Sequence, residues 1–423
     1  MLDDIAIVSN VFPFKTNSYV IEELINWDQP INDPIFNLVF PKKGMLLEHH
    51  YRMMKQGMDI FSAKELNNLS NSIRSELNPQ PAGQKTLNTP ILNGERLNGV
   101  QHKYKETVLF FPKNSQTCHA YCTFCFRWPQ FVNMKDQKFA SKEVDKLIEY
   151  LQIHPEVSDL LFTGGDPMVM KARVFEKYIN PILEADIPHL RTIRIGSKSL
   201  SYWPSRYTTD KDADHMLQIF STINQKHNLA FMAHFNHYQE LQTQSLEEAV
   251  TNIRKTGTQI RTQSPILNHI NADHRVWKKM WKMQVDLGMI PYYMFLVRDT
   301  GAQHYFGVTL LNAWRIFNRA YREVSGIART VRGPSMSCTP GKILFSGPAK
   351  IGNEDVMVLK FIQGRDASWV NKPFFAKYNP NAIWIDDLEP VFEDSFFFED
   401  QEIQFQEEDF ATTFPVLDES VNY

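Results

Sequence analysis

From about residue 105 onward, short apolar runs alternate with longer stretches whose apolar residues recur at helical spacing. The alternation of strand and helix repeats about six times, which predicts parallel strands joined by helical crossovers. We therefore expect an α/β fold, a closed or partial (β/α) barrel of the TIM type, with its active site at the C-terminal ends of the strands. The predicted strands are Val108–Phe111, Asp159–Phe162, Thr192–Ile195, Ala230–Ala233, Ile260–Thr262 and Ile290–Leu296, and the predicted helices include Ser141–Gln152, Ala172–Ala185 and Leu246–Lys255.

Two regions flank this predicted core of residues 105–325. Residues 1–104 mix helical periods with polar, Pro- and Asn-rich joints, which predicts a helical N-terminal region. Residues 326–423 are first rich in Gly and Pro and then show strand-like runs at Val356–Phe361 and Ala382–Ile385.

The end of the chain is acidic and rich in phenylalanine. No Lys or Arg follows Lys377, whereas thirteen Asp or Glu residues lie between Asp386 and Glu419, with phenylalanines among them. This pattern is typical of a disordered acidic end, or of a segment that wraps its own barrel or a neighbouring subunit.

Composition narrows the class of protein. The chain has 423 residues, of which 43% are hydrophobic and 22% charged, with a net charge of −3. These values predict an ordinary globular protein with a large core and no nucleic-acid partner. No apolar run reaches the ~18 residues that cross a bilayer. No basic residue precedes Lys15, which is not the pattern of a secretory signal. We therefore expect a cytoplasmic protein that does not enter the membrane.

Three of the four cysteines, Cys118, Cys122 and Cys125, fall within eight residues, with the spacing C-x3-C-x2-C. Three thiolates from one tight loop can hold three irons of a [4Fe–4S] cluster and leave the fourth iron open to a small molecule. The aromatic Phe124 before the last cysteine favours a cluster that binds S-adenosylmethionine (SAM). The alternatives are a structural zinc site with Cys338 or His119 as fourth ligand, and three unrelated buried thiols.

A glycine pair and an aspartate follow the next predicted strand. Gly164 and Gly165 allow close approach of the backbone to a ligand. A free carboxylate at Asp166 would bind an ammonium group, here the amino end of SAM. Alone, a Gly-Gly-Asp segment is weak evidence for a SAM site, because such a segment is often only a turn. It is much stronger evidence when it follows a cysteine triplet.

Together these segments resemble the lysine 2,3-aminomutase family of radical SAM enzymes, from about His102 to Gly364. The resemblance rests on eight segments in the family's order: His102-Lys103-Tyr104, the cysteine triplet, Gly164-Gly165-Asp166, Arg194-Ile195-Gly196-Ser197, His234-Phe235-Asn236-His237, Gln263-Ser264, Gly301 with His304, and Pro340-Gly341-Lys342. It implies a partial (β/α)6 radical SAM barrel with a C-terminal extension that binds pyridoxal 5′-phosphate (PLP) and takes part in oligomerisation.

The resemblance also implies an activity and its site residues. Family members use SAM and PLP together to move an α-amino group to the β-carbon. Lys342 matches the lysine that forms a Schiff base with PLP, and Lys103 with Tyr104 matches an Arg-Tyr pair that contacts PLP. Lys103 keeps the positive charge of the family's arginine but cannot form the two parallel hydrogen bonds of a guanidinium group. Thr107 stands where the family has a second arginine. The residues matched to the SAM site are Phe124, Gly164, Gly165, Asp166, Ser197 and His234.

The substrate positions differ from those of lysine-specific members. Arg127 matches the arginine that binds the substrate α-carboxylate. Ser335 replaces one of two aspartates that hold the distal ammonium of lysine, and Val297, Arg298 or Asp299 lies at the other. We therefore expect an amino acid other than lysine, either neutral or with an acidic side chain that Arg298 or Arg332 would meet.

The leading hypothesis is thus an amino-acid 2,3-aminomutase, with a flavodoxin- or ferredoxin-type electron donor and a dimeric or tetrameric assembly as the family implies. One alternative keeps the SAM radical but acts on an amino acid or peptidyl residue without PLP. Another is a non-enzymatic binding module stabilised by zinc or a cluster.

Overall fold

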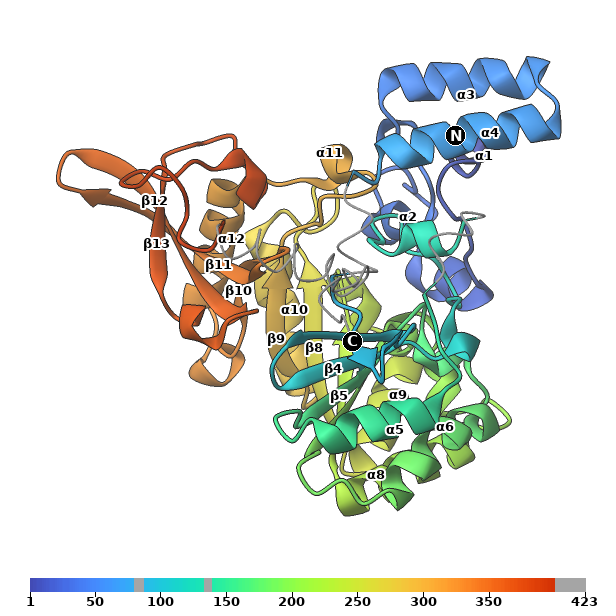
Figure 1. Ribbon diagram of the computed structural model, residues 1–423. Helices are drawn as coiled ribbons and strands as arrows, with labels where there is room; N and C mark the ends of the chain where they lie inside the picture. Colours follow the sequence, from blue (N-terminus) through green and yellow to red (C-terminus); the bar gives the residue numbers. More distant parts are fainter. Residues whose placement is uncertain (80–86, 133–138, 400–423) are drawn as a thin grey trace, which may run out of the picture.

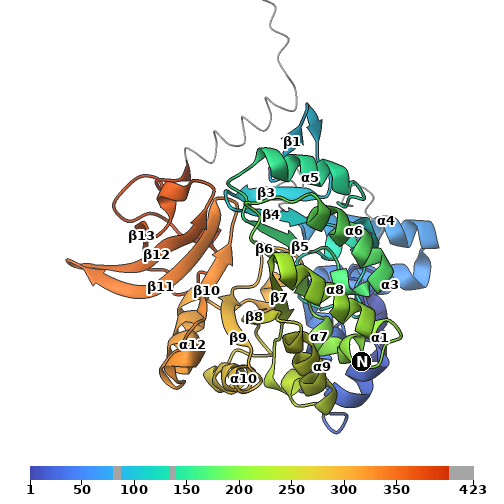
Figure 2. The ribbon, with the colours of Figure 1, turned by 90° about the horizontal axis from the view of Figure 1, so that it is seen from below.

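The computed structural model describes residues 1–79, 87–132 and 139–399, which form one curved sheet with helices on its outer face and a helical region at one end (Figures 1 and 2). The sheet has eleven strands in the order β13-β12-β11-β10-β9-β8-β7-β6-β5-β4-β3. Their bounds are β3 Val100–Tyr104, β4 Thr107–Phe110, β5 Asp159–Phe162, β6 Thr192–Ser197, β7 Asn228–His234, β8 Gln259–Pro265, β9 Ile290–Phe295, β10 Arg332–Ser337, β11 Gly341–Ile351, β12 Glu354–Gly364 and β13 Pro373–Lys377.

Strands β4 to β10 run parallel to one another, and β3 and β11 to β13 are antiparallel additions at the two ends. No ladder joins the two edge strands within the described residues, so the barrel is partial, as predicted. The six predicted strands are confirmed. A seventh parallel strand, β10, was missed because its Arg-Gly-Pro-Ser sequence lacks the apolar run of a buried strand.

Helices follow the strands and cover the outer face of the sheet (Figure 2). In α6, Phe175, Ile179 and Ile182 are buried at spacings of four and three, which turns one apolar stripe towards the sheet. Strand β6 contributes Ile193 and Ile195, which are both fully buried on the side of the strand that faces the helices. The covering helices are α5 Val144–Ile153, α6 Ala172–Glu184, α8 Ala213–Lys226, α9 Gln244–Lys255, α10 His274–Asp286 and α12 Leu310–Arg322; two short helices, α7 Ser199–Tyr202 and α11 Gln303–Phe306, lie in loops.

The N-terminal region forms a second hydrophobic core together with loops of the barrel, which contribute residues such as Trp128 and Phe306. Its α3 and α4 lie side by side as a hairpin (Figure 1), and α4 begins with a capping box between Ser62 and Glu65. The region expected to be helical also holds three strands, of which β3 joins the main sheet. Its elements are α1 Leu2–Val8, the π-helical turn η1 Val20–Leu24, α2 Pro34–Val39, α3 Glu48–Ile60, α4 Ala63–Glu76, and the small hairpin of β1 Ile91–Leu92 and β2 Glu95–Arg96.

The C-terminal region is a β-meander on the end of the sheet. Val356–Phe361 lies within β12, as predicted. The strand predicted at Ala382–Ile385 is wrong: the segment is irregular and leads into a 3-10 turn, because the Asp387 carboxylate accepts hydrogen bonds from the Ile383 and Trp384 amides. Ala382 and Trp384 are apolar here because they are buried, not because they form a strand.

Part of the acidic tail is ordered against this meander. Phe396 and Phe398 are buried and contact the rings of Phe361, Trp369 and Phe374. The first part of the tail therefore packs on its own chain. The remainder, including Phe405 and Phe410, lies outside the described residues. Among the described helices, none has the length and apolarity needed to cross a membrane.

Candidate active site

The cysteine triplet lies in the loop between β4 and α5, between the barrel and the N-terminal core. Cys118, Cys122 and Cys125 are free and half-buried. The Cys125 amide donates to the Cys122 carbonyl at 3.1 Å, which closes a tight turn between the last two cysteines. The sequence spacing thus places all three cysteines in one short loop.

The N-terminal region holds this loop by its backbone. The Thr123 amide donates to the Leu38 carbonyl at 2.9 Å, and the Tyr121 amide donates to the Lys15 carbonyl at 2.8 Å. The Lys15 ammonium in turn donates to the Cys118 carbonyl at 2.7 Å. The shape of the loop therefore depends on residues that lie at least 85 positions away in sequence, which local spacing does not reveal.

The chemistry of the three thiols fits an iron–sulfur cluster. Burial raises the pKa of Cys122 to about 12 and that of Cys125 to about 11, and it raises the pKa of Cys118 well above its usual range. Deprotonated thiolates here therefore need the positive charge of a metal centre. The three sulfur atoms do not form a group within 4.8 Å of one another in the described chain. A single zinc ion would hold them about 3.8 Å apart, given Zn–S bonds of ~2.3 Å.

The glycine pair lets the end of β5 approach the segment before Cys118. The Gly165 amide donates to the Ser115 carbonyl at 3.0 Å. A Cβ at Gly165 would lie 2.3 Å from the Thr117 carbonyl oxygen, and one at Gly164 would lie 2.6 Å from the Ser115 hydroxyl. Both glycines therefore lie against the protein's own cysteine loop, and their approach to a ligand stays a prediction.

We expect Gly165→Ala to destabilise both the fold and the cluster site. The added methyl group meets backbone atoms, which cannot rotate away, so the free energy of unfolding should fall by about 1–3 kcal/mol, with lower iron retention. Thermal unfolding and iron analysis measure these effects. Gly326→Ala is the matched control, because nothing lies within 4 Å of its Cβ position; equal stability of the two variants would contradict the prediction.

Asp166 was expected to offer a free carboxylate, and the structure corrects this. The side chain is 2% exposed and accepts hydrogen bonds from the Ser197 hydroxyl at 2.7 Å, the Met168 amide at 2.9 Å and the Lys198 amide at 2.9 Å. His119 lies 3.6 Å away. Asp166 therefore joins the ends of β5 and β6 behind the cysteine loop, because its oxygens are occupied by the protein.

His119, within the triplet, is a buried group that this network leaves unsatisfied. Neither of its ring nitrogens has a hydrogen-bond partner among the described residues, and burial lowers its pKa to about 4. The hydroxyl of Tyr202 is likewise buried without a partner in the described chain, and the two rings lie 6.3 Å apart. Two such polar groups beside the thiols fit a polar ligand at this end of the barrel.

Lys198 was not predicted as a site residue from the sequence, although it directly follows Ser197. Its ammonium donates to Glu240 at 2.6 Å and to Asn236 at 2.9 Å, and it lies 4.1 Å from the centre of the Tyr202 ring. Glu240 is fully buried. The positive charge of Lys198 acts on Cys122 against the effect of burial. Glu240, the other member of this ion pair, raises the pKa of Cys122, so the two groups act on the thiol in opposite directions.

The other two residues matched to the SAM site lie near these loops. His234 ends β7, and its Nε2 lies 2.9 Å from the Gln263 amide nitrogen. Burial lowers the pKa of His234 to about 3, so the ring is neutral. Phe124 is half-buried, with its ring 6.4 Å from that of Phe306. The family motifs at His234 and Gln263 therefore form one hydrogen-bonded pair on adjacent strands.

Lys342 lies at the start of β11, where aromatic rings surround its amine. The amine donates to the Gln363 side chain at 2.8 Å and lies 4.3 Å from the centre of the Tyr293 ring and 5.8 Å from that of Tyr104. Burial, followed by the charges of Arg194 and Arg332, lowers the pKa of Lys342 to about 7. A large share of this amine is therefore unprotonated at neutral pH, as a nucleophilic lysine requires.

The fold brings Lys103 to the same place from the far side of the sheet. Its ammonium donates to the carbonyl of Cys338, 235 residues later in the sequence. Arg365, from the end of β12, donates to the carbonyl of Thr339 at 2.9 Å. The β10–β11 turn therefore reaches across to β3, and Lys103, Tyr104 and Lys342 share one enclosure. Arg365 was not expected from the sequence, because only the fold makes it a neighbour of Lys103.

Arg127 presents a guanidinium group without a carboxylate partner in the described part of the chain. It lies 4.4 Å from the centre of the Phe111 ring and 5.1 Å from that of Phe126. Burial lowers its pKa to about 10, and the nearby charge of Arg298 acts in the same direction. Because the contacts of this guanidinium in the described residues are with aromatic rings, its hydrogen-bond donors are available to a carboxylate ligand.

The other predicted substrate residues are already engaged. Arg298 donates to Asp299 at 3.2 Å. Ser335 is fully buried on β10, and its hydroxyl donates to the Met294 carbonyl at 3.4 Å. Arg332 lies 4.3 Å from the centre of the Tyr293 ring, on the Lys342 side of the barrel. Neither of the two positions that hold aspartates in lysine-specific members therefore presents a free carboxylate.

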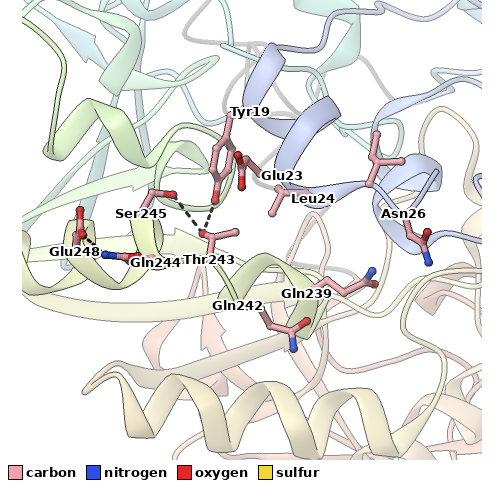
Figure 3. Close-up of a pocket in the computed structure, with 11 residues that line it drawn as sticks. Tyr19, Glu23, Leu24, Asn26, Gln239, Gln242, Thr243, Gln244, Ser245 and Glu248 are labelled. Carbon is pink, nitrogen blue, oxygen red and sulfur yellow. Dashed lines mark hydrogen bonds between the residues drawn. The ribbon is translucent and has the colours of Figure 1, made fainter. Parts of the chain in front are cut away.

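A polar pocket of about 870 Å³ lies elsewhere, between η1 and α9 (Figure 3). Tyr19 and Thr243 bond across it at 2.6 Å, and Glu23 and Glu248 also line it. None of the site residues predicted from the sequence lines this pocket, so we assign it no role.

Comparison with known proteins gives the family. No family model matches the chain. A protein of Aquifex aeolicus named "Putative L-lysine 2,3-aminomutase" is 31% identical over 380 residues, which is 90% of this chain and 88% of that protein. L-lysine 2,3-aminomutase of Acetoanaerobium sticklandii is 29% identical over 49% of this chain and 47% of its own length, and that of Bacillus subtilis is 29% identical over 47% and 39%.

Among solved structures, Streptococcus suis SuiB overlaps 64% of this chain and 55% of its own, with 11% identity and a TM-score of 0.34, a low similarity. Sequence identity across nine tenths of the chain is the stronger finding, and the cysteine triplet lies within a barrel of the expected kind. The chain belongs to the lysine 2,3-aminomutase family of radical SAM enzymes.

Proposed function

We propose that this protein is an amino-acid 2,3-aminomutase that holds a [4Fe–4S] cluster, SAM and PLP, and that its substrate is an amino acid other than lysine. The observation that carries the proposal is the Lys342 amine, whose pKa is lowered to about 7 in an enclosure shared with Lys103 and Tyr104. A merely structural lysine in a turn would be solvated and charged.

Each cofactor has candidate residues in the chain. Cys118, Cys122 and Cys125 would bind three irons and leave one for SAM. When bound, the cluster and SAM would supply a 5′-deoxyadenosyl radical, and PLP would spread an unpaired electron over its ring. Lys342 would hold PLP, and the charge of Lys103 would face the PLP phosphate. A flavodoxin- or ferredoxin-type donor would supply the electron.

The protein's own groups orient the reactants. Asp166 keeps the β5 and β6 ends together behind the cysteine loop through its bonds to Ser197 and Lys198. The charge of Arg298 lowers the pKa of both Arg127 and Lys103, so Arg298 lies between the cysteine end and the lysine end of the site. A substrate bound through its α-carboxylate at Arg127 would therefore be close to both cofactors.

The charge around Lys342 favours a substrate with an acidic side chain. Arginine side chains lie close enough to act on both lysines, with Arg332 lowering the pKa of Lys342 and Arg365 that of Lys103. Asp299, a carboxylate near the substrate position, is paired with Arg298. A second substrate carboxylate would satisfy this excess of positive charge, whereas the distal ammonium of lysine would add to it.

We expect an anaerobic screen of amino acids to give β-amino products from glutamate or aspartate with a kcat/KM at least ~10-fold above that from lysine, because a charge-assisted hydrogen bond contributes about 1.5–3 kcal/mol. Arg298→Gln should reduce this preference. Arg319→Gln is the control, since Arg319 lies on the exposed side of α12. Preferred turnover of lysine would contradict the substrate assignment.

A second candidate is a family member that uses the SAM radical without PLP. One observation favours it: Lys103 already donates to the Cys338 carbonyl, so a phosphate would have to compete for that ammonium. Thr107, in place of a second arginine, adds no charge. A cluster-loaded protein that cleaves SAM but binds no added PLP would favour this candidate over the first.

A further inference from the structure

The helical hairpin of α3 and α4 carries two histidines and a glutamate at one end, and none of the three belongs to the site described above. His49 and His50 lie in the first turn of α3, and Glu76 is the last residue of α4. One ring nitrogen of each histidine and one oxygen of Glu76 all lie within 4.8 Å of one another, and the described chain contains no other such group of three.

Burial distinguishes this group from an ordinary surface pair. His50 is 1% exposed, and its Nε2 lies 2.8 Å from the Glu76 carboxylate. Its Nδ1 is buried and has no hydrogen-bond partner among the described residues. The ring of exposed His49 lies 4.0 Å from that of His50. A simple hydrogen bond between His50 and Glu76 explains neither the unsatisfied nitrogen nor the second imidazole.

We propose that His49, His50 and Glu76 bind a divalent transition-metal ion of the Zn²⁺ type. Two imidazoles and one carboxylate are a donor set that zinc accepts, with water at the fourth position; His49 and Glu76 are exposed, so water has access. Mg²⁺ and Ca²⁺ prefer oxygen ligands. The ligating imidazole nitrogens bind the ion in their unprotonated form.

The ion would fix the end of α4, from which the chain contacts the substrate side of the barrel. The carbonyl of Leu77 accepts a hydrogen bond from the Gly301 amide at 2.7 Å, and the side chain of Asn78 accepts one from Thr300 at 3.0 Å. Trp128, next to Arg127, donates to Thr300 at 3.2 Å. Metal binding therefore steadies the loop after β9 whatever reaction the enzyme performs.

The test is a Zn²⁺ titration of the full chain with its cluster reconstituted, under anaerobic conditions and against a competing fluorescent zinc indicator. We expect one site per chain that His49→Ala weakens by more than ~100-fold, since even outer partners of metal ligands contribute ~10–100-fold. His215→Ala should bind as the wild type does, because the His215–Glu176 pair, at 3.2 Å, has no third ligand in the described chain. Zinc should also slow hydrogen exchange at the Gly301 amide.

Glu76→Gln is the second variant, because it keeps a side chain of the same size and should bind as weakly as His49→Ala. Zinc ions held by unfilled cysteines would appear equally in the wild type and both variants. Equal affinity in the wild type and His49→Ala, or no zinc bound by the wild type, would overturn the site. Unchanged exchange at Gly301 in zinc-loaded protein would overturn its link to the β9 loop.

Discussion

Replacing Cys122 by serine is expected to abolish reductive cleavage of SAM, with iron falling from about four per chain towards none after anaerobic reconstitution. Cys122 is buried next to Lys198, and its pKa of about 12 means that only a bound metal holds it as a thiolate. A serine hydroxyl binds soft iron–sulfur centres poorly. Iron and sulfide analysis and the yield of 5′-deoxyadenosine measure the effect.

Cys338 provides the matched control for this prediction. It is the one cysteine outside the triplet, and it is buried at the β10–β11 turn. The hydrogen bond that it accepts from Lys103 goes to its backbone carbonyl and not to its thiol. Cys338→Ser should keep its iron and its SAM cleavage. If instead Cys338→Ser loses iron and Cys122→Ser retains it, the cluster does not lie at the triplet.

Replacing Lys342 by alanine is expected to weaken PLP binding by at least ~100-fold and to remove all β-amino product, while SAM cleavage persists. A covalent lysine link together with its pocket contributes far more than one neutral hydrogen bond, which alone is ~0.5–1.5 kcal/mol. The violet absorbance of lysine-bound PLP and its trapping by borohydride measure the loss. Lys350→Ala, on the exposed part of the same strand, is the control.

The pH dependence of PLP capture tests the same residue without a mutation. The amine reacts only when unprotonated, so the rate of PLP capture should rise as pH increases through about 7 and level off above it. A solvated lysine would instead give a rate still rising at pH values near 10. Full violet absorbance in Lys342→Ala, or a midpoint near that of an ordinary lysine, would show that PLP is held elsewhere.

Local pattern predicted most of the secondary structure of the barrel. The strand at Asp159–Phe162 and the helix beginning at Ala172 were expected at those residues, since a short apolar run marks a buried strand and a period of 3.6 marks the buried face of a helix. The same reasoning failed at Arg332–Ser337, where a buried strand has no apolar run, and at Ala382–Ile385, where buried residues form no strand. In both cases the tertiary environment outweighed local propensity.

Candidate residues could be named from the sequence, but their partners could not. The glycine pair and Asp166 were found by motif, yet both contact protein, because the cysteine loop folds back onto the end of β5. Lys198 and Glu240 carry no motif signal, and their buried ion pair beside Cys122 exists only because loops after β6 and β7 meet.

The sequence alone determined the cysteine triplet, the order of the family's motifs and the alternation of strands and helices, because each depends on spacing within a short stretch of chain. Only the tertiary structure brought Lys103 and Tyr104 to Lys342 and lowered the pKa of that lysine, since both effects depend on the curvature of the sheet. Burial and charge at a site are sums over neighbours from distant segments, and a linear pattern does not contain those neighbours.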